Sequence, residues 1–177
     1  MNLYFRRLWI YLSALFAGNR TPLMQAHVRH YRVWLTDQDM FMHMTNSRYL
    51  SFSDLGRLNL LLRTGLHRSL QEHGWSLEIC AQTRTITRML KSPQSFELSC
   101  EIVGWTDNFI AFRHLFKRAQ KTHAEVNSIM RITDAGDHPV PIDTVLASID
   151  SLSPSPDLPE LFRDLIQQTE RALDRTD

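Results

Sequence analysis

The chain has 177 residues, of which 43% are hydrophobic and 22% are charged. This size and composition are typical of one soluble globular domain with tails, and they exclude a disordered chain and a polytopic membrane protein. Lys and Arg number 20 against 19 Asp and Glu, so the chain lacks the positive excess that favours nucleic-acid binding. Cys80 and Cys100 form no CxxC pair, which predicts small buried thiols in a reducing, cytoplasmic setting and argues against a disulfide framework or a zinc site.

The first 20 residues form a separate apolar segment. Arg6 and Arg7 precede an apolar run from Leu8 to Ala17, which ends at Gly18. The run is shorter than the roughly 20 residues that cross a bilayer, and it offers few small residues for signal cleavage. Three interpretations stay open: a helix packed on the domain or on a dimer partner, a peripheral anchor through residues 3–17 on the inner face of a membrane, and a signal peptide.

Two periodic segments follow in chain order. Alternation of apolar and polar residues predicts a first strand over residues 27–35. A polar connection over residues 36–45 comes next, and Thr45 or Asn46 can cap the following helix. Apolar residues then recur at three- and four-residue spacing up to Gly65, which predicts an amphipathic helix. The stripe consists of Phe52, Leu55, Leu58 and Leu62.

Beyond a loop over residues 67–74, the pattern becomes strand-like with short turns. The expected strands cover residues 77–89, 96–102, 110–116 and 126–132. This order predicts an α+β fold, in which an antiparallel sheet of about five strands wraps around one central helix. Ser153 to Pro156 is interpreted as a linker, and residues 158–173 as a C-terminal helix. The predicted organisation is an apolar helix over 1–20, a sheet domain over 21–150, and a linker with a helix over 151–177.

The connection before the central helix carries a recognisable motif. Its residues are Asp37-Gln38-Asp39, His43-Met44-Thr45-Asn46 and Arg48-Tyr49-Leu50. They resemble the D-x-D-x-x-x-H-x-N-N-x-R-Y pattern of hot-dog thioesterases of the 4-hydroxybenzoyl-CoA thioesterase type, over roughly Tyr31 to Leu161. The segment around Leu158–Leu161 is similar to a poorly characterised thioesterase-like subgroup. The resemblance implies a hot-dog fold, acyl-CoA hydrolysis, no cofactor beyond the coenzyme A of the substrate, no metal, and at least a homodimer with the active site at its interface.

Asp39 is the catalytic candidate that this resemblance implies, as nucleophile or as general base. The alternative is an aspartate that only satisfies the amides of a turn. His43 is expected to pin the loop or to position substrate, and Asn46 to cap the helix and hold the loop. The chain departs from the family pattern at Thr45, and at Phe41-Met42, where many members have a glycine before the histidine.

Other charged residues are weaker candidates. Asp37 is expected to be structural. Asp54 lies off the apolar stripe, where it pairs with Arg57 or serves as a second carboxylate near the acyl pocket. Because coenzyme A carries phosphates, basic residues are expected at the pocket mouth, although each can equally be a solvated strand charge. The candidates are Arg84, Arg88, Lys91, Arg113, Lys117 and Arg118.

Two further functions stay open beside the thioesterase. A hot-dog hydratase or dehydratase would use His43 and Asp39 on one substrate carbon. A non-catalytic protein that binds acyl chains or coenzyme A at a membrane surface is favoured by the departures at Thr45 and Phe41-Met42.

Overall fold

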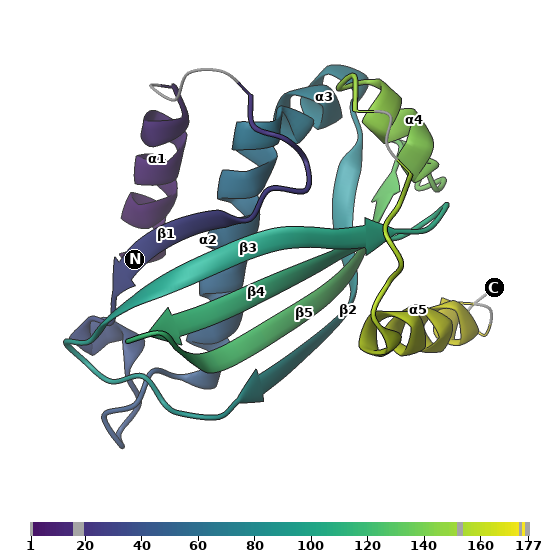
Figure 1. The fold of residues 1–177 in the computed structure, drawn as a ribbon. Coiled ribbons are helices and arrows are strands. Elements are labelled where there is room, and N and C mark those ends of the chain that lie inside the picture. The colour runs from purple at the N-terminus through teal and green to yellow at the C-terminus, as the bar shows by residue number, and fades with distance from the viewer. Residues whose placement is uncertain (1, 16–19, 152–153, 174, 176–177) are drawn as a thin grey trace.

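The predicted sheet around one helix is present in the computed structural model, which describes residues 2–15, 20–151, 154–173 and 175. Five antiparallel strands curve around the long helix α2 (Figure 1). Their spatial order is β1-β3-β4-β5-β2, so β1 and β2 form the two edges. The bounds are β1 (His27–Arg32), α2 (Asn46–Thr64), β2 (Ser76–Ile86), β3 (Ser95–Trp105), β4 (Ile110–Arg118) and β5 (Lys121–Thr133). The α+β prediction is therefore confirmed.

Helix α2 approaches the sheet closely because it carries a glycine on its buried face. A Cβ atom at Gly56 would lie 3.1 Å from Leu98 Cδ2 and 3.3 Å from Cys100 Cβ of β3. The helix ends as predicted at Gly65, whose φ of 87° is in the left-handed region that glycine adopts without strain. Helix α2 therefore lies in close contact with β3 and ends at Gly65.

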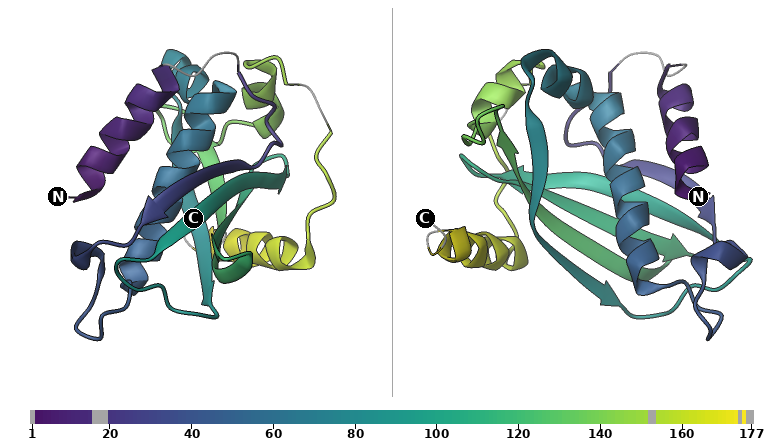
Figure 2. Two further views of the ribbon diagram at one scale, coloured as in Figure 1. Left: turned by 60° about the vertical axis from the view of Figure 1, so that its left-hand side comes forward. Right: turned by 180° about the vertical axis from the view of Figure 1, so that it is seen from behind.

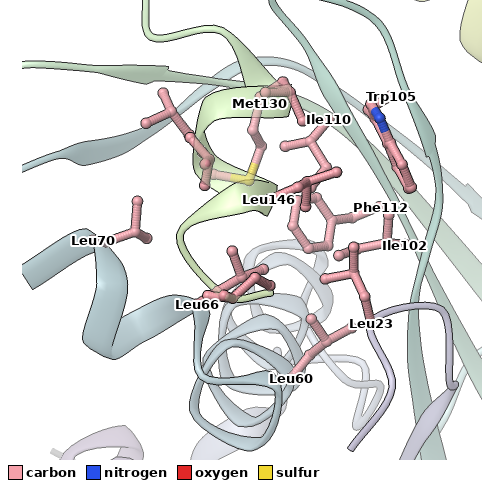
Figure 3. Packing of buried hydrophobic residues seen from close by; sticks show 14 of the residues in the cluster. Leu23, Leu60, Leu66, Leu70, Ile102, Trp105, Ile110, Phe112, Met130 and Leu146 are labelled. Carbon is pink, nitrogen blue, oxygen red and sulfur yellow. The ribbon is translucent and has the colours of Figure 1, made fainter. Parts of the chain in front are cut away.

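Two apolar clusters fill the space between α2 and the sheet. Figure 3 shows the first cluster, in which Leu60, Leu66, Phe112 and Met130 are buried together with their neighbours. The second lies nearer the start of α2 and is largely aromatic. Its ring contacts include Tyr49–Phe116 with centroids 5.2 Å apart, Phe52–Phe96 at 5.1 Å and Tyr31–Phe52 at 5.1 Å. Both clusters bury the inward side chains that alternate along the strands.

The structure corrects three details of the sequence prediction. Strand β1 ends at Arg32, and the chain turns into the short 3-10 helix η1 (Leu35–Asp37), where Leu35 is exposed. The loop expected over residues 67–74 is the helix α3 (Leu66–His73). Helix α4 (Ile142–Ala147) was not expected. These helices are too short to be stable alone, so tertiary burial stabilises them.

Helices α1 (Asn2–Leu15) and α5 (Glu160–Leu173) extend the domain at opposite sides (Figure 2). Helix α1 packs beside α2, whereas Phe162 of α5 packs on Ala111 and Ile129, on the outer face of the sheet. No helix among the described residues is long and apolar enough to cross a bilayer. The end of the apolar run at Ala17, its stop at Gly18, and Ser153 of the expected linker lie outside the described residues.

Candidate active site

The motif loop forms a tight hairpin between η1 and α2. Asp39 N donates to His43 O at 2.9 Å, and Met42 N donates to Asp39 O at 3.1 Å. The hairpin is fastened on both sides, because Gln38 pairs with Met44 and His43 pairs with Lys91 in isolated β-bridges. His43 therefore holds the loop through its backbone, and the role expected for its imidazole stays a prediction.

The Asp39 carboxylate has one oxygen in the turn and one outside it. Its Oδ1 accepts hydrogen bonds from Phe41 N at 2.9 Å and His43 N at 3.2 Å. Its Oδ2 has no hydrogen-bond partner among the described residues, and the residue is exposed. The turn thus fixes the carboxylate orientation while one oxygen faces solvent.

The same turn occurs a second time, at the end of β5. Asp134 Oδ1 accepts hydrogen bonds from Gly136 N at 2.8 Å and His138 N at 3.0 Å, and Asp134 N donates to His138 O at 3.0 Å. These amide bonds hold the pKa of Asp134 below its ordinary value. The turn alone therefore explains why an aspartate stands at position 39, and any chemistry must come from the surroundings of that residue.

Met42 lies where many hot-dog thioesterases with a similar motif have a glycine before the histidine. Its φ of 62° is in the left-handed region, as is the φ of 63° at Asp137 in the second turn. The backbone geometry that a glycine would favour is therefore kept, at the cost of placing a non-glycine residue there. The departure at Phe41-Met42 leaves the loop conformation intact.

Asp37 joins three elements and is structural, as expected. Its side chain is fully buried and pairs with Arg6 of α1 at 2.8 Å and Arg48 of α2 at 3.4 Å. It also accepts a hydrogen bond from Trp34 N at 3.0 Å, while its carbonyl accepts one from Thr45 N at 2.9 Å. The motif's first aspartate thus fixes the position of the loop relative to α1 and α2.

The start of α2 differs from the prediction in one respect. Thr45 is the N-cap residue and Asn46 the first helical residue, so the expected cap by Asn46 is wrong. No side chain caps this end, because the Thr45 hydroxyl contacts Ser47 Oγ at 3.2 Å instead. Arg84 of β2 donates to Asn46 O at 3.0 Å. A guanidinium and the positive end of a helix therefore lie beside the hairpin.

Asp54 forms the ion pair with Arg57 that the spacing predicts. It also lines the α1–α2 pocket, an open pocket of about 750 Å³ between α1, α2, α3 and β2. Leu58, Leu61 and Leu77 supply apolar wall, and a hydrogen bond of 3.2 Å between Tyr11 and His67 closes one side. Asp39 lines neither this pocket nor the two smaller ones, of about 440 and 500 Å³. The structure thus separates the two candidate carboxylates.

The basic candidates are divided between the two faces of the sheet. Arg84 and Lys91 lie beside the hairpin through the contacts given above, and Arg88 N donates to His123 O just beyond β2. Arg113 lies on the outer face, where it pairs with Glu101 and Glu125 and stacks on Phe162 of α5. Of these four, Arg84 and Lys91 are the ones placed beside the loop. Lys117 and Arg118 flank the turn between β4 and β5.

Sequence reasoning gave no role to a polar group inside the core. His114 of β4 is fully buried, and only its Nδ1 has a partner, Val126 O at 3.2 Å. Burial, followed by the charge of Arg57, lowers the pKa of His114 to about 3. The sequence did carry a signal for this buried group, because His114 stands at an inward position in the apolar alternation of β4. The contribution of Tyr4, Arg7 and Tyr11 of α1 to the α1–α2 pocket had no such signal.

Comparison with known proteins agrees with this architecture. Residues 33–149 match the model of the thioesterase-like superfamily. Protein THEM6 of Danio rerio is 28% identical over 127 residues, which cover 72% of this chain and 62% of that protein, so the chain spans less than two thirds of this relative. The probable thioesterase YbaW from Escherichia coli has a TM-score of 0.65 at 12% identity, covering 70% of this chain and 96% of that chain.

A third similarity is to a structure whose substrate is named. The gentisyl-coenzyme A thioesterase BH1999 has a TM-score of 0.62 at 17% identity, covering 68% of this chain and 99% of that chain. At such identities the structural neighbours support the hot-dog fold alone. The sequence match spans most of the domain, and the chain is a hot-dog protein that belongs to the thioesterase-like superfamily.

Proposed function

We propose that this protein hydrolyses acyl-coenzyme A thioesters, with Asp39 acting as nucleophile or general base. The observation that carries the proposal is the placement of the Asp39 carboxylate on the loop that leads into α2, beside Arg84 and Lys91. Two amides fix one of its oxygens, and the other faces solvent on the loop that leads into α2. A fixed carboxylate with a free oxygen is what the attack on a thioester carbonyl requires.

The reaction needs a second feature beside the carboxylate. When water or the carboxylate attacks the carbonyl carbon, the carbonyl oxygen becomes negative, and when the C–S bond breaks, the thiolate leaves and takes a proton. The first N–H groups of a helix have no partner within the helix and carry partial positive charge. The start of α2, which follows the hairpin directly, is therefore a suitable place to stabilise the oxyanion.

The surroundings of Asp39 suit an acyl-CoA. Met40, Phe41 and Met42 follow it directly, and their side chains are 87%, 71% and 59% exposed, so an acyl chain could lie on them. Arg84 and Lys91 lie beside the same loop and could bind the phosphates of coenzyme A. Asp134 has the same turn without these neighbours.

We further propose that a second copy of the chain completes the site. Asp39 lines none of the three pockets described above, so we infer that one wall of its substrate pocket comes from a second chain. Hot-dog proteins usually pair their sheets, and β2 is an edge strand with β5 as its neighbour. A homodimer in the cytoplasm is the assembly that the proposal requires.

Two observations favour a second candidate, a non-catalytic protein that binds acyl chains. The α1–α2 pocket of about 750 Å³ has partly apolar walls and does not include Asp39. The hydrogen bonds of Asp39 also match those of Asp134, which lies in a plain turn. In that case Asp54, which lines the pocket, would face the ligand without acting on it.

Purified protein offered short, medium, long and aromatic acyl-CoAs separates these functions. A hydrolase releases free thiol from at least one of them, whereas a binding protein retains acyl-CoA without release. Water addition to an enoyl-CoA would indicate the hydratase. Gel filtration of the same sample reports the homodimer. Thiol release from none of the substrates would refute the proposed activity.

A further inference from the structure

Helix α1 buries Ile10 in the core but exposes most of its other large apolar residues. Tyr4, Phe5, Leu8 and Trp9 are 74%, 73%, 55% and 67% exposed, whereas Arg6 points inward. A surface helix of a soluble domain normally buries its apolar stripe and exposes its charges. The exposed apolar side chains of α1 therefore mark an interaction surface.

Polar contacts hold α1 in this orientation. Arg6 pairs with the buried Asp37 at 2.8 Å, and its Nη2 also donates to Arg32 O at 3.2 Å. Near the other end of the helix, Arg29 of β1 donates to Ser13 Oγ at 2.8 Å. Because these bonds fix the rotation of the helix about its axis, it cannot turn its apolar side toward the core.

An open groove continues the exposed surface onto β1. The groove has a volume of about 500 Å³ and lies between α1 and the edge strand β1, and we call it the α1–β1 groove. Phe5, Trp9, Val28 and Trp34 are its exposed apolar residues. The remaining lining residues are Arg6, Ile10, Arg29, His30 and Tyr31, and none is acidic.

The charged side chains of residues 1–36, which supply the whole lining of the groove, have a single sign. Residues 1–36 contain Arg6, Arg7, Arg20, Arg29 and Arg32 but no Lys, Asp or Glu. The first acidic side chain, at position 37, is fully buried and paired with arginines. The surface that these residues present is therefore apolar and cationic.

We propose that the outer face of α1 and the α1–β1 groove bind the surface of an anionic lipid bilayer, with α1 lying in the plane of the interface. Tryptophan and tyrosine side chains favour headgroup depth, and arginines attract anionic headgroups. The 14 residues of α1 span about 21 Å, which is shorter than the roughly 30 Å hydrocarbon layer. A second copy fits less well, because a twofold contact would bring like-charged arginines together.

Sedimentation with vesicles tests the proposal on the full chain. Vesicles of phosphatidylcholine alone are compared with vesicles that also contain phosphatidylglycerol, at low salt and at about 0.5 M NaCl. The variants are Trp9→Glu and Arg7→Glu. The matched control is Leu161→Glu on α5, which is exposed and lies at the opposite side of the molecule (Figure 2). Circular dichroism and sedimentation velocity establish that each variant is folded and report its oligomeric state.

We expect the wild type to bind anionic vesicles and to dissociate at high salt. Each unit of charge near the surface contributes about fivefold, so Arg7→Glu, which changes the charge by two units, should weaken this binding about 25-fold. Trp9→Glu adds one negative charge and removes the indole, and should weaken it by more than about tenfold. Leu161→Glu should bind like the wild type. The proposal is overturned if folded wild type binds neither kind of vesicle, or if Trp9→Glu binds as well as Leu161→Glu. Dissociation of a dimer by Trp9→Glu without any vesicle binding would assign the surface to a second copy and overturn it too.

Discussion

The ion pairs of Asp37 give the sharpest stability prediction. The carboxylate is fully buried, Arg6 and Arg48 are 11% and 22% exposed, and Trp34 N adds a third donor. Asp37→Asn keeps the size of the side chain but removes its charge, so two guanidinium groups lose their partner. Breaking a buried ion pair costs about 3–5 kcal/mol. Because the exposed part of Arg48 can turn to water, we expect the low end, about 3 kcal/mol.

Urea denaturation of the wild type and Asp37→Asn measures this loss directly. For a chain of this size the same loss should lower the melting temperature by about 6–12 °C. Glu72→Gln is the matched control, since it breaks an ion pair at the surface. The side chains of Glu72 and its partner Arg68 are 53% and 71% exposed. That variant should unfold like the wild type. Equal unfolding of both variants would refute the reasoning that Asp37 anchors α1 and the loop.

Three further predictions concern the core and the turn. The pKa of His114 is about 3 when folded against 6.5 ordinarily, so the unfolded chain binds a proton that the folded chain does not. Stability should therefore fall by up to about 1.4 kcal/mol per pH unit as pH drops from 6.5 toward 3. His114→Gln should flatten this slope in urea titrations, and an unchanged slope would contradict the burial of a neutral ring. Met42→Gly should be about 1 kcal/mol more stable than Met40→Gly in chemical denaturation, because Met42 alone of this pair has a positive φ; equal stability would mean that the turn is unstrained. Gly56→Val should lower the free energy of unfolding by about 2 kcal/mol or more, since even its Cβ meets Leu98 at 3.1 Å; a melting temperature like that of the wild type would exclude the close approach of α2 to β3.

Local patterns were sufficient for the main elements of the fold. The apolar spacing predicted α2, and Gly65 marked its end because a left-handed residue stops the helix. Alternation of apolar and polar residues predicted the strands, since inward side chains recur every second residue along a strand. Helix α3 was missed because it has only eight residues, so that Leu66 and Leu70 alone mark its buried face, and their burial in the core stabilises it.

The candidate site was predictable only in part. The motif placed Asp39 before α2, and the three-residue spacing on the helix predicted the pairing of Asp54 with Arg57. It could not predict the bond from Arg6 to Asp37, which joins residues 31 apart in sequence. The recurrence of the Asp39 turn at Asp134 did have a sequence signal that was missed, because in both segments a histidine follows the aspartate by four residues, at His43 and His138.

The rate of thiol release by Asp39→Asn tests the central claim most directly. Asp134→Asn is the matched control, because Asp134 makes the same turn at the far end of β5. On the acyl-CoA that the wild type hydrolyses fastest, we expect kcat/KM to fall by about a hundredfold or more in Asp39→Asn, and to stay near that of the wild type in Asp134→Asn. Equal activity of the two folded variants would contradict a chemical role for Asp39.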